Sequence, residues 1–179
     1  MAVRPILLFP DPNLKQVCET VGDLDDSVCT LLSDLTDTLY ASPGVGLAAP
    51  QIGSRLRAVA VDVTNTPSGR PPVMGHGLVV LLNPRVVKME GVQIFREGCL
   101  SIPDFLANVQ RAAWVRVEGL DVRGEPLILE ADGFEAVVFQ HEIDHLDGIL
   151  FLDRVDNIKT DLFRRKQGLS TNLSPKYTN

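Results

Sequence analysis

Two of the chain's three histidines, His141 and His145, lie four residues apart, and Glu142 follows the first of them in the pattern H-E-x-x-H. Residues four apart lie on the same face of an α-helix, so two imidazoles at this spacing can bind one metal ion. The glutamate can then accept a proton from metal-bound water. The motif therefore indicates a metal-dependent hydrolase.

The residues before the motif favour a buried position for it. Phe134, Val137 and Val138 continue the helical stripe that carries both histidines, so the stripe is apolar. The alternative is a surface helix with two solvated histidines. Buried histidines need partners, and two on one apolar face indicate a shared partner.

A catalytic metal site of this kind usually has three protein ligands, and the third can be sought on either side of the motif. In H-E-x-x-H proteases the third ligand lies downstream. Here no histidine follows His145 and no glutamate follows Glu142, which leaves the aspartates at positions 147, 153, 156 and 161. Upstream, Cys99 follows Gly98 and could complete a Cys-His-His site, although a single cysteine is more often a packed thiol.

Three segments of the chain resemble the signature motifs of the peptide deformylase family. They occur in the family's order, as Gly44-Val45-Gly46-Leu47-Ala48-Ala49-Pro50-Gln51, Glu97-Gly98-Cys99-Leu100-Ser101 and Gln140-His141-Glu142-Ile143-Asp144-His145. The similarity extends from the N-terminal region to about Asp153. It implies an enzyme that removes the N-formyl group from the formylmethionine of newly synthesised polypeptides and releases formate.

The resemblance also implies a metal site. Cys99, His141 and His145 would bind one divalent metal ion, characteristically Fe²⁺, which Zn²⁺ or Ni²⁺ can replace. A thiolate and two imidazoles suit all three metals, so the spacing of the ligands does not choose among them.

By the same resemblance, three residues would act on the reacting atoms. Glu142 would accept the proton of the attacking water and deliver it to the departing amine. Gln51, through its side-chain amide, and Leu100, through its backbone N–H, would donate hydrogen bonds to the oxyanion.

The substrate-binding residues follow from the first motif and from the apolar face of the metal helix. Glycines 44 and 46 let a strand run close to an extended peptide, and the resemblance implies that Val45 and Gly46 line the groove. Phe134, Val137 and Val138 would form the pocket for the methionine side chain, although they could equally be core residues.

The sequence also contains a possible ion pair, Glu97 with Arg111, and a third histidine, His76. Glu97 and Arg111 form either a pair that orients the cysteine loop or a simple surface salt bridge. We expect His76 to be exposed to solvent and not to bind the metal.

The composition is that of a globular protein, with 45% hydrophobic and 22% charged residues. The net charge of −6 gives no electrostatic argument for nucleic-acid binding. No stretch approaches the roughly 20 apolar residues of a membrane span. The three cysteines, Cys18, Cys29 and Cys99, form no paired pattern and indicate a reducing compartment. We expect a monomer in the bacterial cytoplasm that contacts the ribosome transiently, with an organellar origin as the alternative.

The hydrophobic pattern predicts one α+β domain over residues 1–179, with small antiparallel or mixed sheets packed around a central metal-binding helix. Helices are expected from Asp25 or Asp26 to about Tyr40, from a capping box at Asp132 and Glu135 to Gly148, and over 156–167. Strands are expected at 57–63, 78–82, 85–90, 92–95, 113–121 and 126–130. Residues 65–77 are expected to form a loop, and about 168–179 a frayed tail.

Two other functions fit parts of this sequence. A metallopeptidase or other amidase would cleave internal peptide bonds and would use a downstream carboxylate in place of Cys99. A non-catalytic peptide-binding domain or a structural metal site would have no use for a base such as Glu142, and structural sites are normally closed by four ligands.

Overall fold

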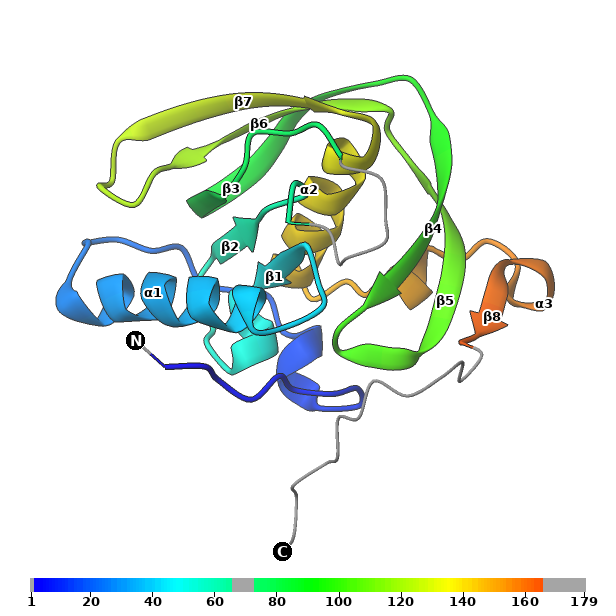
Figure 1. Cartoon of the computed structure of the whole chain (residues 1–179), viewed down its shortest axis with the longest axis horizontal. Helices are drawn as coiled ribbons and strands as arrows, with labels where there is room; N and C mark the ends of the chain where they lie inside the picture. Colours follow the sequence, from blue (N-terminus) through cyan, green and yellow to red (C-terminus); the bar gives the residue numbers. More distant parts are fainter. Residues whose placement is uncertain (1, 66–72, 166–179) are drawn as a thin grey trace, which may run out of the picture.

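The computed structural model describes residues 2–65 and 73–165, and it places helix α2 (Gly133–Leu146) between two antiparallel sheets (Figure 1). The larger sheet has the order β1-β2-β3-β6-β7, with the strands Gly46–Ala48, Ala58–Val61, Val79–Glu90, Trp114–Leu120 and Pro126–Asp132. The smaller has the order β4-β5-β8, with the strands Gln93–Cys99, Ile102–Arg111 and Leu162–Arg164. The predicted α+β class is confirmed.

Helix α2 is a core helix. Every residue from 135 to 146 is buried, which is the pattern of a helix that is covered on all sides. Ala136, Phe139, Ile143 and Leu146 pack into the core cluster that the larger sheet shares with the helix. The two histidines of the motif are therefore shielded from bulk solvent by the fold itself.

Helix α1 (Asp26–Tyr40) supports the edge of the larger sheet. Its predicted start is confirmed, because the Asp25 carboxylate accepts a hydrogen bond from the N–H of Val28 at 2.9 Å. Leu35 and Leu39 are fully buried in a second core cluster, which includes Leu47 of β1. Through this packing, α1 holds β1 against the metal helix.

The predicted break of a strand at Asn83-Pro84 is wrong, because β3 continues from Val79 to Glu90. Asn83 has a φ of 51°, and the register against β6 shifts between Leu82 and Arg85. The Asn83 side chain pairs with the N–H and C=O of Val21, both at 2.8 Å. The irregularity is therefore a bulge with its own partners rather than the end of a strand.

The smaller sheet was predicted only in part. The strand expected at 92–95 continues to Cys99, and β5 was not predicted. Pro103, Asp104 and Asn108 disfavour a strand, and regular alternation of buried residues begins only near Ala107. Leu100 and Ser101 form the turn between β4 and β5.

The helix predicted over 156–167 is wrong. Within residues 156–165, only α3 (Ile158–Asp161) is helical, and the chain then forms β8, which pairs with residues 105–107 of β5. The open edge of β5 offers backbone hydrogen bonds that a local helical pattern cannot reveal. The described residues also contain the 3-10 helices η1 (Pro12–Lys15), η2 (Ala49–Ile52) and η3 (Phe151–Arg154). The predicted tail at 168–179 and much of the loop at 65–77 lie outside the described residues.

The predicted capping box is also wrong. The Asp132 side chain makes no capping hydrogen bond, and Glu135 turns instead to His76. Gly148 has a φ of 70° and follows the end of α2 as expected. Among the residues with a described structure, no helix has the length and apolarity required to cross a membrane.

Replacing Gly148 with alanine should destabilise the protein more than the same change at Gly124. Both glycines have positive φ, 70° and 81°, so both variants carry about 1–2 kcal/mol of left-handed strain. A methyl group at Gly148 would also lie 2.7 Å from the backbone oxygen of Lys15, whereas no described atom lies within 4 Å of one at Gly124. The clash should add about 1–3 kcal/mol. Urea unfolding of the two variants measures the difference, and equal losses would contradict this account.

Candidate active site

The structure brings Cys99, His141 and His145 together although the cysteine is more than 40 residues from either histidine. One ligand atom from each lies within 4.8 Å of the others, and all three residues are buried. The Cys99 Sγ atom is 3.2 Å from Nε2 of His145, and the two imidazole rings lie 4.9 Å apart, edge to face. Within residues 2–65 and 73–165 this is the one cluster of metal-binding side chains, and it contains none of the downstream aspartates.

The residues present fit a catalytic divalent metal. A thiolate and two imidazoles are ligands for Fe²⁺, Zn²⁺ and Ni²⁺, and a set of three leaves a position for water. Glu142, which follows His141, has a buried Oε2 atom without a hydrogen-bond partner among the described residues. A buried carboxylate oxygen with no protein partner fits a site in which it contacts a water molecule or the substrate.

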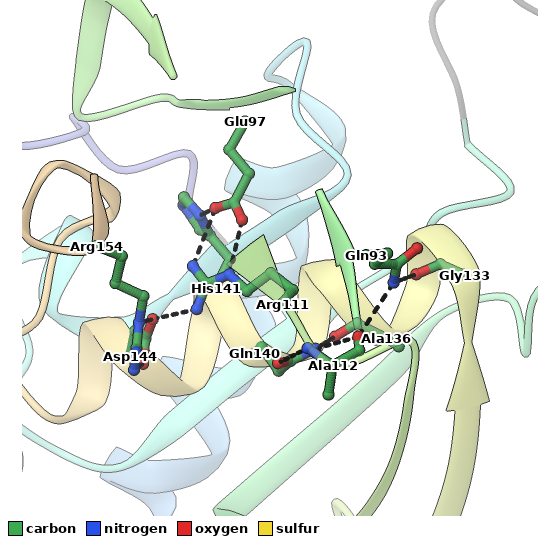
Figure 2. A network of polar contacts seen from close by, with 10 residues as sticks. All are labelled: Gln93, Glu97, Arg111, Ala112, Gly133, Ala136, Gln140, His141, Asp144 and Arg154. Carbon is green, nitrogen blue, oxygen red and sulfur yellow. Dashed lines mark hydrogen bonds and ion pairs between the residues drawn. The ribbon is translucent and has the colours of Figure 1, made fainter. Parts of the chain in front are cut away.

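The orientation of His141 is set by a buried ion pair (Figure 2). Its Nδ1 lies 2.7 Å from Oε2 of Glu97, and Arg111 donates to both oxygens of that carboxylate, at 2.7 and 3.0 Å. An Nδ1–H that donates to Glu97 leaves Nε2 free to bind a metal. Glu97 and Arg111 are 5% and 4% exposed, so the pair orients the site and the alternative of a surface salt bridge is wrong.

Arg111 also connects the site to the C-terminal part of the described chain. It donates to Asp144 on α2, and the guanidinium of Arg154, in η3, holds the same carboxylate through Nε and Nη2 (Figure 2). Asp144 and Arg154 were not predicted as site residues. The signal for Asp144 was its place inside the H-E-x-x-H motif, three residues after His141, where a charged side chain on a buried helix requires a partner.

The pKa values of the buried acids follow from these contacts. Burial raises the pKa of Glu97, but its hydrogen bonds with His141 and Arg111 outweigh burial and lower the pKa to about 2. Burial raises the pKa of Glu142 to about 7 in the chain without a metal. The two glutamates therefore differ in role, because one is a fixed negative charge and the other can exchange a proton near neutral pH.

Gln51 is held with its amide nitrogen towards Cys99. Its Oε1 accepts a hydrogen bond from the N–H of Ala48 at 2.8 Å. Its Nε2 donates to Oγ of Ser101 at 3.1 Å and lies 3.5 Å from Sγ of Cys99. Because the oxygen is occupied by a backbone donor, the amide cannot turn round without losing these contacts. Gln51 thus presents N–H groups beside the proposed metal ligands.

Strand β1 runs directly against the helix at Gly46. A side chain there would collide with the carboxylate of Glu142 and would come within 2.8 Å of Val138. At Gly44, a side chain would come within 2.7 Å of Leu100. Both glycines therefore allow close packing against side chains of the protein itself, and their predicted approach to a peptide stays a prediction.

Two strand edges flank the cluster. β1 is one of the two outer strands of the larger sheet and β4 one of the two outer strands of the smaller one, so within the described chain each pairs with a strand on one side only. β1 carries Gly46, and β4 ends at Cys99 of the cluster. Figure 1 shows both strands beside α2, with β1 and β4 belonging to different sheets. The arrangement offers two sets of backbone groups to an extended chain.

Three of the residues predicted to bind the substrate side chain, Phe134, Val137 and Val138, lie in the first turns of α2. Val45 and Phe134 are partly buried against the core cluster that contains Val138, and Val137 is buried. The Phe134 ring stacks on Phe95 of β4 with centroids 5.0 Å apart. Phe95 was not predicted, and its place opposite α2 depends on how the two sheets meet.

Glu97→Gln should weaken metal binding about 10- to 100-fold. The NH₂ group of the glutamine would face an N–H donor of Arg111 or His141, so the side chain would no longer hold the His141 imidazole in place. Competition for Zn²⁺ with a coloured chelator measures the affinity. Glu118→Gln is the matched control, since Glu118 pairs with the exposed Arg85 on β3. An unchanged affinity in Glu97→Gln would show that the pair does not orient His141.

The comparisons with known proteins agree with this geometry. Residues 3–161 match the family model described as polypeptide deformylase. The peptide deformylase of Syntrophobacter fumaroxidans is 42% identical, over 93% of this chain and 94% of the relative. The crystal structure of a peptide deformylase from Legionella pneumophila has a TM-score of 0.79 and 40% identity, covering 88% of this chain and 89% of that one. The structure from Thermotoga maritima has a TM-score of 0.78 and 33% identity, covering 88% of this chain and 100% of that one. The chain belongs to the polypeptide deformylase family.

Proposed function

We propose that the chain is a metal-dependent hydrolase that removes the formyl group from the N-terminal formylmethionine of newly synthesised polypeptides and releases formate. The observation that carries the proposal is the buried cluster of Cys99, His141 and His145, with Glu142 and Gln51 beside it. Membership of the deformylase family supports the same reaction.

Cys99, His141 and His145 would hold one divalent metal ion, and we propose Fe²⁺, with Zn²⁺ or Ni²⁺ able to replace it. When bound, such an ion lowers the pKa of its water and polarises the carbonyl oxygen of the substrate. The thiolate favours a borderline metal over Mg²⁺ or Ca²⁺, which prefer oxygen ligands.

Glu142 would act as the base and then as the acid. It accepts a proton as the water oxygen forms a bond to the formyl carbon, and it returns the proton to the nitrogen as the C–N bond breaks. The products are formate and a free α-amine. Its raised pKa, about 7 in the chain without a metal, suits a group that must both accept and donate.

Gln51 and Leu100 would stabilise the negative charge that develops on the formyl oxygen. The Gln51 Nε2 already points towards Cys99 through its contacts with Ser101 and Ala48. Leu100 follows Cys99 in the turn between β4 and β5, so its backbone N–H is close to the same ligand. Donors held in place before the reaction cost no reorganisation during it.

The peptide would lie extended between the edges of β1 and β4. Backbone hydrogen bonds from both edges would grip it whatever its sequence. Selectivity for methionine would then come from the apolar residues beside the metal helix, which are Val45, Gly46, Phe134, Val137 and Val138.

The two alternative functions have less support. A metallopeptidase was expected to take a downstream carboxylate as its third ligand, and the cluster in the described residues contains Cys99 instead. A structural site would need a fourth protein ligand.

We further propose that the chain acts as a monomer in the cytoplasm of a bacterium and meets its substrate during transient contact with the ribosome. Formylated chains arise at the ribosome, and the relatives named above are bacterial proteins. The proposal includes no nucleic-acid specificity and no membrane association.

Protein loaded with Fe²⁺ under anaerobic conditions should release formate from a short formyl-Met peptide. Glu142→Ala should retain the metal and lose about a hundredfold or more in kcat, since it removes the base. Cys99→Ala should lose both metal and activity. Cys29→Ala is the matched control because Cys29 is exposed. Absence of formate at a full equivalent of bound metal would contradict the proposed function.

Gln51→Leu should lower kcat about a hundred- to a thousandfold, which corresponds to roughly 3–4 kcal/mol of lost oxyanion stabilisation. The metal content should not change. Gln93→Leu serves as the control, because the Gln93 amide donates to the carbonyls of Ala112 and Gly133, neither of which is a predicted site residue. A rise in KM with an unchanged kcat would instead make Gln51 a ground-state contact.

A further inference from the structure

The segment that leads into β3 is attached to the first turn of the metal helix. The Glu135 carboxylate accepts a hydrogen bond from the backbone N–H of His76 at 2.9 Å, and its other oxygen lies 2.8 Å from Nδ1 of the same residue. The Glu135 side chain is only 5% exposed. Both oxygens of a buried carboxylate are thus used on one residue from a distant part of the chain.

Gly75 allows this contact to be close. A side chain at Gly75 would come within 2.8 Å of Oε1 of Glu135 and would collide with Val63. The backbone of residues 75–76 is therefore pressed against the helix. Separating Glu135 from His76 would leave a buried carboxylate without its main hydrogen-bond partner. The free-energy cost of such an unsatisfied group opposes the separation.

The contact lies next to the proposed methionine pocket. Phe134 precedes Glu135, and Val138 lies one helical turn after it. Val73 packs against the same core cluster as Val45 and Phe134. Residues on both sides of the Glu135–His76 contact therefore pack against the cluster that contains Val138.

We propose that Glu135 and His76 form a latch that fixes the position of Phe134 and Val73, and through them the shape of the pocket for the substrate's first side chain. Glu135 is then a positioning residue for side-chain selectivity and does not touch the reacting atoms. The inference rests on the proposed function for the pocket itself. It does not concern the metal ligands, since Glu135 lies six residues before His141.

The first readout is independent of activity. In the zinc-loaded protein, Glu135→Ala should raise the rate of amide hydrogen exchange about tenfold or more over residues 73–78 and in the first turn of α2. Glu135→Gln should remain close to the parent protein, because the amide oxygen can still accept from the His76 N–H. Glu130→Ala is the matched control, since Glu130 on β7 pairs with the half-exposed Arg116. Unchanged exchange in Glu135→Ala would overturn the latch.

The second readout is the ratio of kcat/KM for formyl-Met and formyl-Leu peptides. An apolar pocket discriminates such side chains by about 10- to 200-fold in kcat/KM. If the pocket is less well ordered in Glu135→Ala, the formyl-Met to formyl-Leu ratio should fall roughly tenfold, mainly through a change in KM. His76→Ala should lower the ratio in the same direction, and the double variant should add little to either single change. Faster exchange with an unchanged ratio would reduce the contact to a structural one and overturn the proposal.

The two readouts also separate this inference from the proposed function. If the parent protein released no formate from either peptide, the proposed function would fail and the selectivity role would fail with it. Hydrogen exchange would still decide whether the latch exists. If formate were released but the ratio did not respond to Glu135→Ala, only the latch proposal would fail. If Glu135→Ala did not fold, His76→Ala would carry both measurements because it leaves the helix unchanged.

Discussion

The active site depends on one group of buried charges. Arg111 on β5 holds Glu97 on β4 and Asp144 on α2, and Arg154 holds Asp144 from the other side. Removing one partner of such a group leaves an uncompensated buried charge and typically costs about 3–5 kcal/mol. The group joins the smaller sheet to the metal helix. Because Glu97 also holds His141, the orientation of a proposed ligand is set by the same contacts that hold the fold together.

In the proposed reaction, the chemical step takes place at buried, rigid residues, and the peptide is bound by strand edges and a turn. The proposed ligands and Glu142 come from the end of β4 and from a helix that is buried on all sides, so their geometry exists before a substrate arrives. The groups proposed to bind the peptide lie on strand edges and in a turn. Gln51 connects the two parts, since it contacts the N–H of Ala48 on β1 and the turn residue Ser101. One side chain thus connects the rigid cluster to the strand edge and the turn that are proposed to bind the peptide.

Those features that depend on local pattern could be predicted from the sequence. The helix of the motif, α1 with its Asp25 cap, and strands β6 and β7 were confirmed. The meeting of Cys99 with the two histidines was implied by the family resemblance rather than by local pattern, and the structure brings the three side chains together. The errors come from partners that are distant in sequence. β8 replaces a predicted helix because β5 offers an open edge, and Glu135 leaves its expected capping role for His76. The catalytic and substrate-binding roles remain proposals.

The open edges of β1 and β4 have a consequence for the protein when no peptide is bound. Unpaired backbone groups on an outer strand are a template on which a second copy of the chain could assemble. β1 limits this hazard by having three residues, one of them a glycine. β4 has a register shift between Gly98 and Cys99, and it places the exposed side chain of Arg96 shortly before that point. The short edge of β1 and the irregular end of β4 can therefore accept one passing peptide while disfavouring continuous pairing with a second copy.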